Sequence, residues 1–216
     1  MGKPRSPKGR AALVAERLAE LYPGDARALC ELDHDNAFQL LAATILSAQT
    51  TDVRVNEVTP VLFARYPTPA ALGEAIPEDL EELIHSTGFF RAKAKSLIAM
   101  ANRLVDTFGS EVPTSIEDLT SLAGVGRKTA NVVRSVALDL PGLPVDTHVL
   151  RLSQRLGLTT EEDPVKVEHA LNGLVAPAER GVFSVRVILH GRRVCAAKKP
   201  LCGFCVLADF CPSAGK

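Results

Sequence analysis

The chain has 216 residues, of which 46% are hydrophobic and 23% are charged, and its formal net charge is zero. This length and apolar content suit one compact unit or two small lobes with a substantial core, and they exclude a disordered chain. No apolar run approaches the roughly 18 residues that a membrane span needs. The basic start is followed by Glu16 before any signal-like apolar segment forms. We therefore expect a soluble cytoplasmic protein without a membrane partner.

The charged residues are unevenly distributed along the chain. Zero net charge argues at first against a nucleic-acid partner, because lysine and arginine supply much of the affinity for phosphates. From residue 181 to the end, however, six basic residues stand against Asp209 alone, whereas residues 74–82 contain five acidic ones. The distribution predicts one basic and one acidic face. Solvated helix faces that bind nothing would give the same pattern.

Apolar residues recur at helical spacing along the whole chain, and no segment alternates with the period of a strand. After a loose basic arm over residues 1–10, we expect helices over residues 11–22, 38–48, 52–66, 77–88, 89–108, 149–156, 161–174 and 182–189. Shorter helices start at Thr68-Pro69 and at a capping box over residues 114–117. The helix over 38–48 is apolar on nearly all sides, which is typical of a bundle centre. The helix over 89–108 is basic at Arg91, Lys93 and Lys95.

The most specific pattern lies between Leu122 and Leu150, LAGVGRKTANVVRSVALDLPGLPVDTHVL. Gly124-Val125-Gly126 forms a bend before a helix that opens with Arg127-Lys128-Thr129. Two glycines one residue apart permit positive φ, and they remove side chains that would keep a phosphate from the amides of the next helix. Asp146 looks like the cap of a later helix. An anion site, an amine and a carboxylate thus lie within one short stretch.

Four cysteines close the sequence, Cys195, Cys202, Cys205 and Cys211. Their spacing allows four thiolates to surround one centre. Disulfides are disfavoured in a reducing cell interior, and Cys30, which stands far from the others, is expected to be an idle thiol. The spacing alone does not decide between structural zinc and an iron–sulfur cluster.

Several motifs in order carry a family resemblance: AFQL at 37–40, SAQTTD at 47–52, the central stretch above, and LHGR at 189–192 with the final cysteines. Together they resemble the helix-hairpin-helix DNA glycosylases of the endonuclease III type, over nearly everything after residue 10. The resemblance implies an all-α, two-lobed fold with a cleft. Residues 30–140 would form a helical bundle with the helix-hairpin-helix motif at about 115–138, and residues 1–29 and 141–216 a second lobe. The cysteines would bind a structural [4Fe–4S] cluster.

The resemblance also implies an activity, that of a bifunctional DNA glycosylase and abasic-site lyase. Such an enzyme removes oxidised pyrimidines from duplex DNA in base excision repair, here as an expected monomer. The family's nucleophilic lysine falls on Lys128, which would attack the sugar C1′, form a Schiff base and permit β-elimination. The start of a helix beside Arg127 favours the neutral amine. Asp146 would stabilise the sugar cation and help to deprotonate the nucleophile. Without the resemblance, a phosphate-binding lysine and a simple helix cap would account for both residues.

Contacts with damaged double-stranded DNA follow from the same resemblance. Gln49 aligns with the residue that fills the gap left by a flipped nucleotide, and Phe89 with a wedge that is commonly Leu. A helix-end polar residue and a core Phe are their structural alternatives. Further DNA contacts are expected from Gly124, Val125, Gly126, Arg127, Thr129, His148, Arg193 and Lys198. His190 is expected to be a buried, bonded histidine rather than a catalyst.

Two other functions remain open. Mismatch adenine glycosylases share the cluster, but they usually lack the lysine and carry a further C-terminal domain. A non-catalytic helix-hairpin-helix protein would bind bent or damaged DNA, although the presence of both Lys128 and Asp146 argues against it. Neither lesion preference nor opposite-base preference follows from the sequence.

Overall fold

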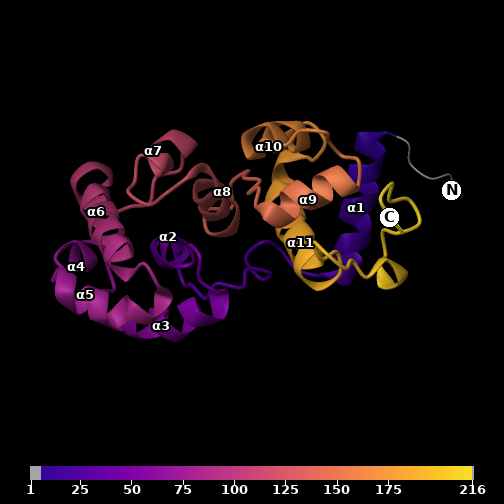
Figure 1. The fold of residues 1–216 in the computed structure, drawn as a ribbon. Coiled ribbons are helices and arrows are strands. Elements are labelled where there is room, and N and C mark those ends of the chain that lie inside the picture. Colours follow the sequence, from indigo (N-terminus) through magenta and orange to yellow (C-terminus); the bar gives the residue numbers. More distant parts are fainter. Residues whose placement is uncertain (1–5, 216) are drawn as a thin grey trace. The chain divides into compact units, whose positions relative to one another are not determined.

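The computed structural model describes residues 6–215, which form eleven α-helices and three short 3-10 helices without any strand (Figure 1). The all-α prediction is therefore confirmed. The chain divides into two compact units. One is Cys30–Leu138, and the other joins the described residues up to Leu29 to those from Asp139 onward. None of the helices in this described part is long and apolar enough to cross a membrane.

The unit Cys30–Leu138 is built around one apolar helix. Its elements are α2 (Ala37–Leu46), α3 (Asp52–Arg65), α4 (Pro69–Gly73), α5 (Pro77–Ile84), η1 (His85–Thr87), α6 (Phe90–Phe108), α7 (Ile116–Thr120) and α8 (Arg127–Val136). Eight of the ten residues of α2 are buried, and this helix packs against α3, α6 and α8. The apolar helix expected at the bundle centre is thus found there. It ends at Leu46, two residues early, because Ser47 caps it and Gln49 has a left-handed backbone with φ of 56°.

Side-chain caps set the starts of several helices in this unit, α2 and α7 among them. Asn36 accepts a hydrogen bond from the Gln39 amide at 3.0 Å and so begins α2. The cap of α7 is Ser115, which accepts from the Asp118 amide at 2.9 Å, so the cap lies one residue later than expected. α6 begins at Phe90 rather than at residue 89, because Phe89 has φ of 48° and cannot continue a right-handed helix.

The second unit brings together both ends of the sequence. Its elements are α1 (Pro7–Leu21), α9 (Thr147–Arg155), α10 (Pro164–Asn172), η2 (Pro177–Glu179), α11 (Arg180–Arg193) and η3 (Cys202–Phe204). In Figure 1 the indigo helix α1 lies beside α11, and α11 packs on both α1 and α9. Leu18 of α1, Val149 of α9 and Val187 of α11 share one core with Leu207 and Phe210 from the tail. The cysteine-bearing tail is therefore part of the hydrophobic core of this unit.

Several expected boundaries in this unit are wrong. The loose arm over residues 1–10 is incorrect for residues 7–10, because Ser6 caps α1 and Pro7 occupies its first turn. Lys3, Arg5 and Lys216 lie outside the described residues. α10 starts at Pro164 instead of residue 161, since Asp163 accepts hydrogen bonds from the amides of residues 165 and 166. α11 runs from Arg180 to Arg193, beyond the expected 182–189.

Candidate functional site

The bend between α7 and α8 contains two glycines with different structural roles. Gly124 has φ of 78°, and a Cβ there would lie 3.0 Å from Ser96 Cβ and 3.4 Å from Ile45 Cγ2. Both the backbone conformation and the packing therefore require glycine at this position.

Gly126, by contrast, is not required by the fold. Its φ of −92° is accessible to any residue, and a Cβ at this position would meet no atom within 4 Å. The expectation of positive φ holds for Gly124 and is wrong for Gly126. The absent side chain of Gly126 leaves open space beside the first turn of α8, where a ligand atom can approach the backbone.

The start of α8 presents positively polarised groups. Gly126 is the N-cap, and no side chain of residues 6–215 caps this helix. Buried Ala130 and Val133 anchor the helix, which packs against α2 and α7. The Val125 side chain is buried, so its backbone alone faces the bend, whereas Lys128 is exposed. Uncapped amides and the helix dipole together favour an anion.

Asp146 is the N-cap of α9 in the other unit. Its Oδ1 accepts hydrogen bonds from the amides of His148 at 2.8 Å and Val149 at 2.9 Å. No described residue donates a hydrogen bond to Oδ2. The half-buried carboxylate is therefore held in place through one oxygen, and the helix cap expected from the sequence is present.

His148 is tied to α11. Its Nδ1 lies 3.1 Å from the Arg151 guanidinium, which also donates to the Gly191 carbonyl at 3.0 Å. A Cβ on Gly191 would lie 2.8 Å from His148 Cβ, so the glycine of the LHGR motif makes room for this residue. Of the two alternatives for His148, the structural contact is thus present, and a phosphate contact stays a prediction.

Gln49 and Phe89 occupy two exposed turns of the unit Cys30–Leu138. Gln49 follows α2 and has φ of 56°, and Phe89 precedes α6 and has φ of 48°. The Phe89 side chain is 68% exposed, which excludes the core alternative. A left-handed backbone costs a non-glycine residue roughly 1–2 kcal/mol. Both exposed side chains are thus presented from strained positions.

The four C-terminal cysteines surround one cavity of about 300 Å³. All are unbridged and half-buried. Burial raises the pKa of the Cys205 thiol, and the neighbouring Cys195, Cys211 and Cys202 raise it further. Cys30, in the other unit, is also unbridged; burial raises the pKa of its thiol. A buried or idle thiol at this position stays a prediction.

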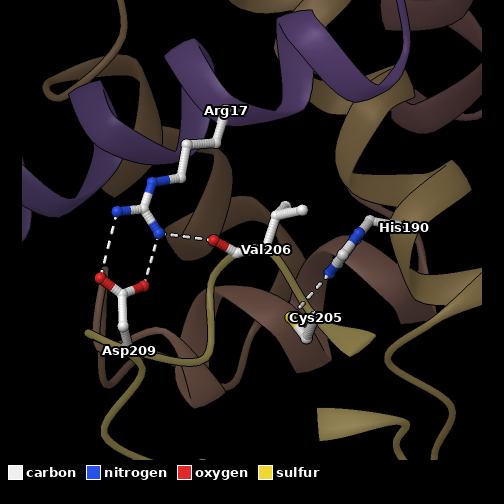
Figure 2. A network of polar contacts seen from close by, with 5 residues as sticks. All are labelled: Arg17, His190, Cys205, Val206 and Asp209. Atoms are coloured by element: carbon white, nitrogen blue, oxygen red, sulfur yellow. Dashed lines mark hydrogen bonds and ion pairs between the residues drawn. The ribbon is translucent and has the colours of Figure 1, made fainter. Parts of the chain in front are cut away.

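Basic side chains hold the tail that carries these cysteines. Figure 2 shows Arg17 of α1 reaching Asp209 and the carbonyl of Val206, and His190 pointing at Cys205. His190 Nε2 lies 3.2 Å from Cys205 Sγ, and the ring is 1% exposed. His190 is therefore buried and bonded, as expected.

The four thiols line one cavity, and their chemistry suits a metal centre. Within the described residues, no group of three or more His, Cys, Asp or Glu side chains could hold a single ion as it stands. Four thiolates are a donor set that fits a [4Fe–4S] cluster, and they fit a zinc ion as well.

Three residues near these sites were not identified from the sequence. Arg155 NH1 lies 3.3 Å from Cys195 Sγ, and Arg151 donates to the Cys195 carbonyl. The two arginines are four residues apart, which places both on one face of α9.

The third residue, Lys93, is buried rather than part of a basic surface. Its spacing from Leu97 and Leu104 puts it on the apolar stripe of α6, a signal that would have predicted its burial.

Comparison with known proteins places the chain in a family. A model described as HhH-GPD superfamily base excision DNA repair protein matches residues 42–177, more than half of the chain. Endonuclease III of Synechocystis sp. is 54% identical over 213 residues, which cover 98% of this chain and 96% of that protein. The chain belongs to the endonuclease III family. Endonuclease III of Bacillus subtilis is 41% identical over 197 residues, which cover 91% of this chain and 89% of that protein.

Solved structures of endonuclease III agree with this assignment. A non-covalent endonuclease III–DNA complex has a TM-score of 0.89 at 39% identity, and it covers 96% of both chains. A trapped endonuclease III–DNA covalent intermediate has a TM-score of 0.88 at 40% identity, with the same coverage. As a member of the endonuclease III family, the chain is a DNA glycosylase and abasic-site lyase of base excision repair.

Proposed function

We propose that this endonuclease III family member removes oxidised pyrimidines from duplex DNA through a Schiff base on Lys128. The observation that carries the proposal is the exposed Lys128 amine in the first turn of α8, directly after an uncapped glycine bend. A phosphate on the bend would bring the neighbouring sugar to the amine. Arg127 and Thr129, half-buried in the same turn, would contact that phosphate from the side.

The reaction divides into two steps, base removal and strand cleavage. In the first, the neutral Lys128 amine attacks C1′, the bond between C1′ and the base breaks, and the base leaves with a proton. The sugar ring then opens, because the C1′–O4′ bond breaks and O4′ takes up a proton, and the C1′–nitrogen bond becomes an iminium. In the second step, the iminium acidifies the C2′ hydrogens, and removal of a C2′ proton breaks the C3′–O bond, which releases the 3′ phosphate and cleaves the strand. This path needs no oxidant or reductant, and the lysine is regenerated by hydrolysis of the imine.

Asp146 would serve the first of these steps from the other unit. Its carboxylate is oriented by two amides that donate to Oδ1, and Oδ2 has no donor among the described residues. A fixed negative charge stabilises a sugar that becomes cationic as the base departs. Asp146 would also help to deprotonate the nucleophile, Lys128.

Gln49 and Phe89 would open the duplex. An enzyme that attacks C1′ must rotate the nucleotide out of the stack. The exposed ring of Phe89 would enter between bases, and Gln49 would occupy the space left by the flipped nucleotide. An aromatic ring stacks on bases, whereas the Leu common at this position only fills space.

Cys195, Cys202, Cys205 and Cys211 would bind a [4Fe–4S] cluster, and its proposed role is structural. When bound, the cluster cross-links the tail and supplies folding free energy to that unit. Exposed Arg193 and Lys198 beside the tail would contact DNA phosphates. We further propose that the enzyme acts as a monomer on double-stranded DNA in the cytoplasm, at the nucleoid if the source is bacterial.

A panel of duplexes, each with one lesion, tests this function. Thymine glycol, an oxidised cytosine and an abasic site are incubated with the protein, and strand cleavage is measured with and without alkali. The proposal predicts cleavage without alkali. Cleavage only after alkali would indicate a glycosylase without lyase activity, such as a mismatch-type enzyme. Binding without loss of any base would instead support the non-catalytic helix-hairpin-helix protein.

A further inference from the structure

Lys93 is a buried lysine that the reaction does not use. It lies in the first turn of α6 and is 5% exposed, whereas Arg91 and Lys95 on the same helix are exposed. Its Nζ donates to the Leu46 carbonyl at 2.7 Å, to Thr50 Oγ1 at 2.9 Å and to the Thr87 carbonyl at 2.8 Å. All three acceptors are neutral oxygens.

The bonding of Lys93 is complete only for the charged form. An ammonium donates three hydrogen bonds, and each of the three has an acceptor. Burial lowers the pKa of Lys93, since it removes water from the charge. A methionine of similar shape would avoid that cost, so the lysine costs free energy unless its hydrogen bonds compensate. The segments that the three hydrogen bonds of Lys93 connect therefore indicate what the buried lysine does.

The acceptors belong to the two turns that carry Gln49 and Phe89. Leu46 ends α2 and Thr50 directly follows Gln49, while Thr87 lies two residues before Phe89. Thr50 Oγ1 also donates to the Thr87 carbonyl, and the Lys93 amide donates to the Phe89 carbonyl at 3.0 Å. Lys93 is thus bonded to both turns at once, through its side chain and its backbone.

Both turns need such support. Gln49 and Phe89 have left-handed backbones with φ of 56° and 48°, which L-residues rarely adopt. Such a conformation persists only where surrounding contacts over-determine it. Two of the three acceptors of the Lys93 ammonium, Leu46 and Thr50, lie within three residues of Gln49, and the third, Thr87, lies two residues from Phe89.

We infer that Lys93 is a positioning residue, whose ammonium holds the two turns in the arrangement in which Gln49 and Phe89 enter duplex DNA together. The inference rests on the proposed function, which assigns those two side chains to the opened duplex. A displacement of about 1 Å in a positioning element can reduce a rate by about a hundredfold. Without the ammonium, the two turns would fluctuate independently, and flipping would lose efficiency before the chemistry is affected.

The test compares Lys93→Met with the matched control Lys95→Met, which removes the same charge from an exposed site on the same helix. Thymine glycol excision is measured on duplex and on the same strand alone, together with the melting temperature. Loss of hydrogen bonds from a charged group predicts a fall of about ten- to a hundredfold on duplex. Activity on the single strand, where no base pair must be opened, should stay near that of the parent. The control should match the parent on both substrates.

Thr50→Val provides a second, milder variant. It removes the hydroxyl that accepts from Lys93 and donates to Thr87, and it preserves the side-chain shape. Thr50→Val should also lower the ratio of duplex to single-strand activity. If Lys93→Met does not fold, Thr50→Val is the variant that tests the inference. Equal losses on both substrates, or an unchanged ratio in the folded variants, would overturn the inference.

The result also separates this inference from the proposed function. If the parent excises nothing from duplex, or Phe89→Ala shows no duplex-specific loss, the proposed roles fail first. If the parent and Phe89→Ala behave as proposed and the Lys93 and Thr50 variants retain the parental ratio, only the positioning role is wrong.

Discussion

Truncation of Phe89 to Ala separates a DNA wedge from a structural side chain. The ring is 68% exposed, so only about a third of its surface is in contact with protein. Full burial of a Phe side chain is worth roughly 1.5–3 kcal/mol, so the substitution should cost less than about 1 kcal/mol. For a chain of this size, that corresponds to a melting shift of at most about 4 °C. Phe38, which is 6% exposed in the same unit, is the matched control, and its truncation should cost about 3–5 kcal/mol.

The loss of function should be much larger than the loss of stability. Stacking of an aromatic ring on a base contributes about 1–3 kcal/mol, which corresponds to roughly ten- to a hundredfold in rate. We therefore expect Phe89→Ala to lose that factor on thymine glycol in duplex. On the same lesion in single-stranded DNA, the variant and the parent should act alike.

The assay is single-turnover excision on both substrates, with melting curves for the parent, Phe89→Ala and Phe38→Ala. A large melting drop for Phe89→Ala with equal losses on both substrates would refute the wedge. In that case Gln49 or Phe90 would be the candidate for insertion into the duplex.

Three further predictions concern the bend, the carboxylate and the tail. Gly126→Ala should leave the melting temperature unchanged and weaken duplex binding, measured by fluorescence anisotropy. The control Gly124→Ala should lose about 1 kcal/mol or more of stability, because of the positive φ at that position and the contact with Ser96. Unchanged duplex binding by Gly126→Ala would show that the phosphate does not bind at this bend. Asp146→Asn should keep the helix cap, and hence the melting temperature, and reduce base excision by about a hundredfold or more; near-parental excision would show that the negative charge is not needed. Anaerobically purified protein should contain about four iron and four sulfide ions per chain. Cys202→Ser should lower the yield of soluble protein more than its specific activity. Protein that contains zinc and no iron would contradict the cluster.

Local patterns made much of the fold and part of the site predictable. The apolar character of residues 38–48 predicted the central helix α2, and Asp146 before Thr147 predicted the cap of α9, because both depend on short-range chemistry. The glycine bend was also evident. Gly124 and Gly126 look equivalent in the sequence, however, and only the packing of Ser96 and Ile45 against the bend shows that the fold requires Gly124 alone.

The residues that could not be predicted depend on contacts distant in sequence. Lys93 seemed to belong to a basic helix face, yet its partners Leu46 and Thr50 lie more than forty residues earlier. Likewise, the contact between Arg155 and Cys195 joins residues forty positions apart. The apolar stripe of α6 could have predicted the burial of Lys93. The three acceptors of its ammonium could not be predicted, because they depend on how α2 packs against α6.

Covalent trapping on Lys128 tests the central claim most directly. Borohydride added during turnover on a thymine glycol duplex should reduce the Schiff base and leave a stable protein–DNA adduct, which peptide mapping should place on Lys128. Lys128→Ala should form no adduct and still bind duplex DNA, and Lys95→Ala, which removes an exposed lysine from the same unit, should form the adduct at the parental rate. An adduct that persists in Lys128→Ala, or that maps to another residue of the parent, would contradict the account.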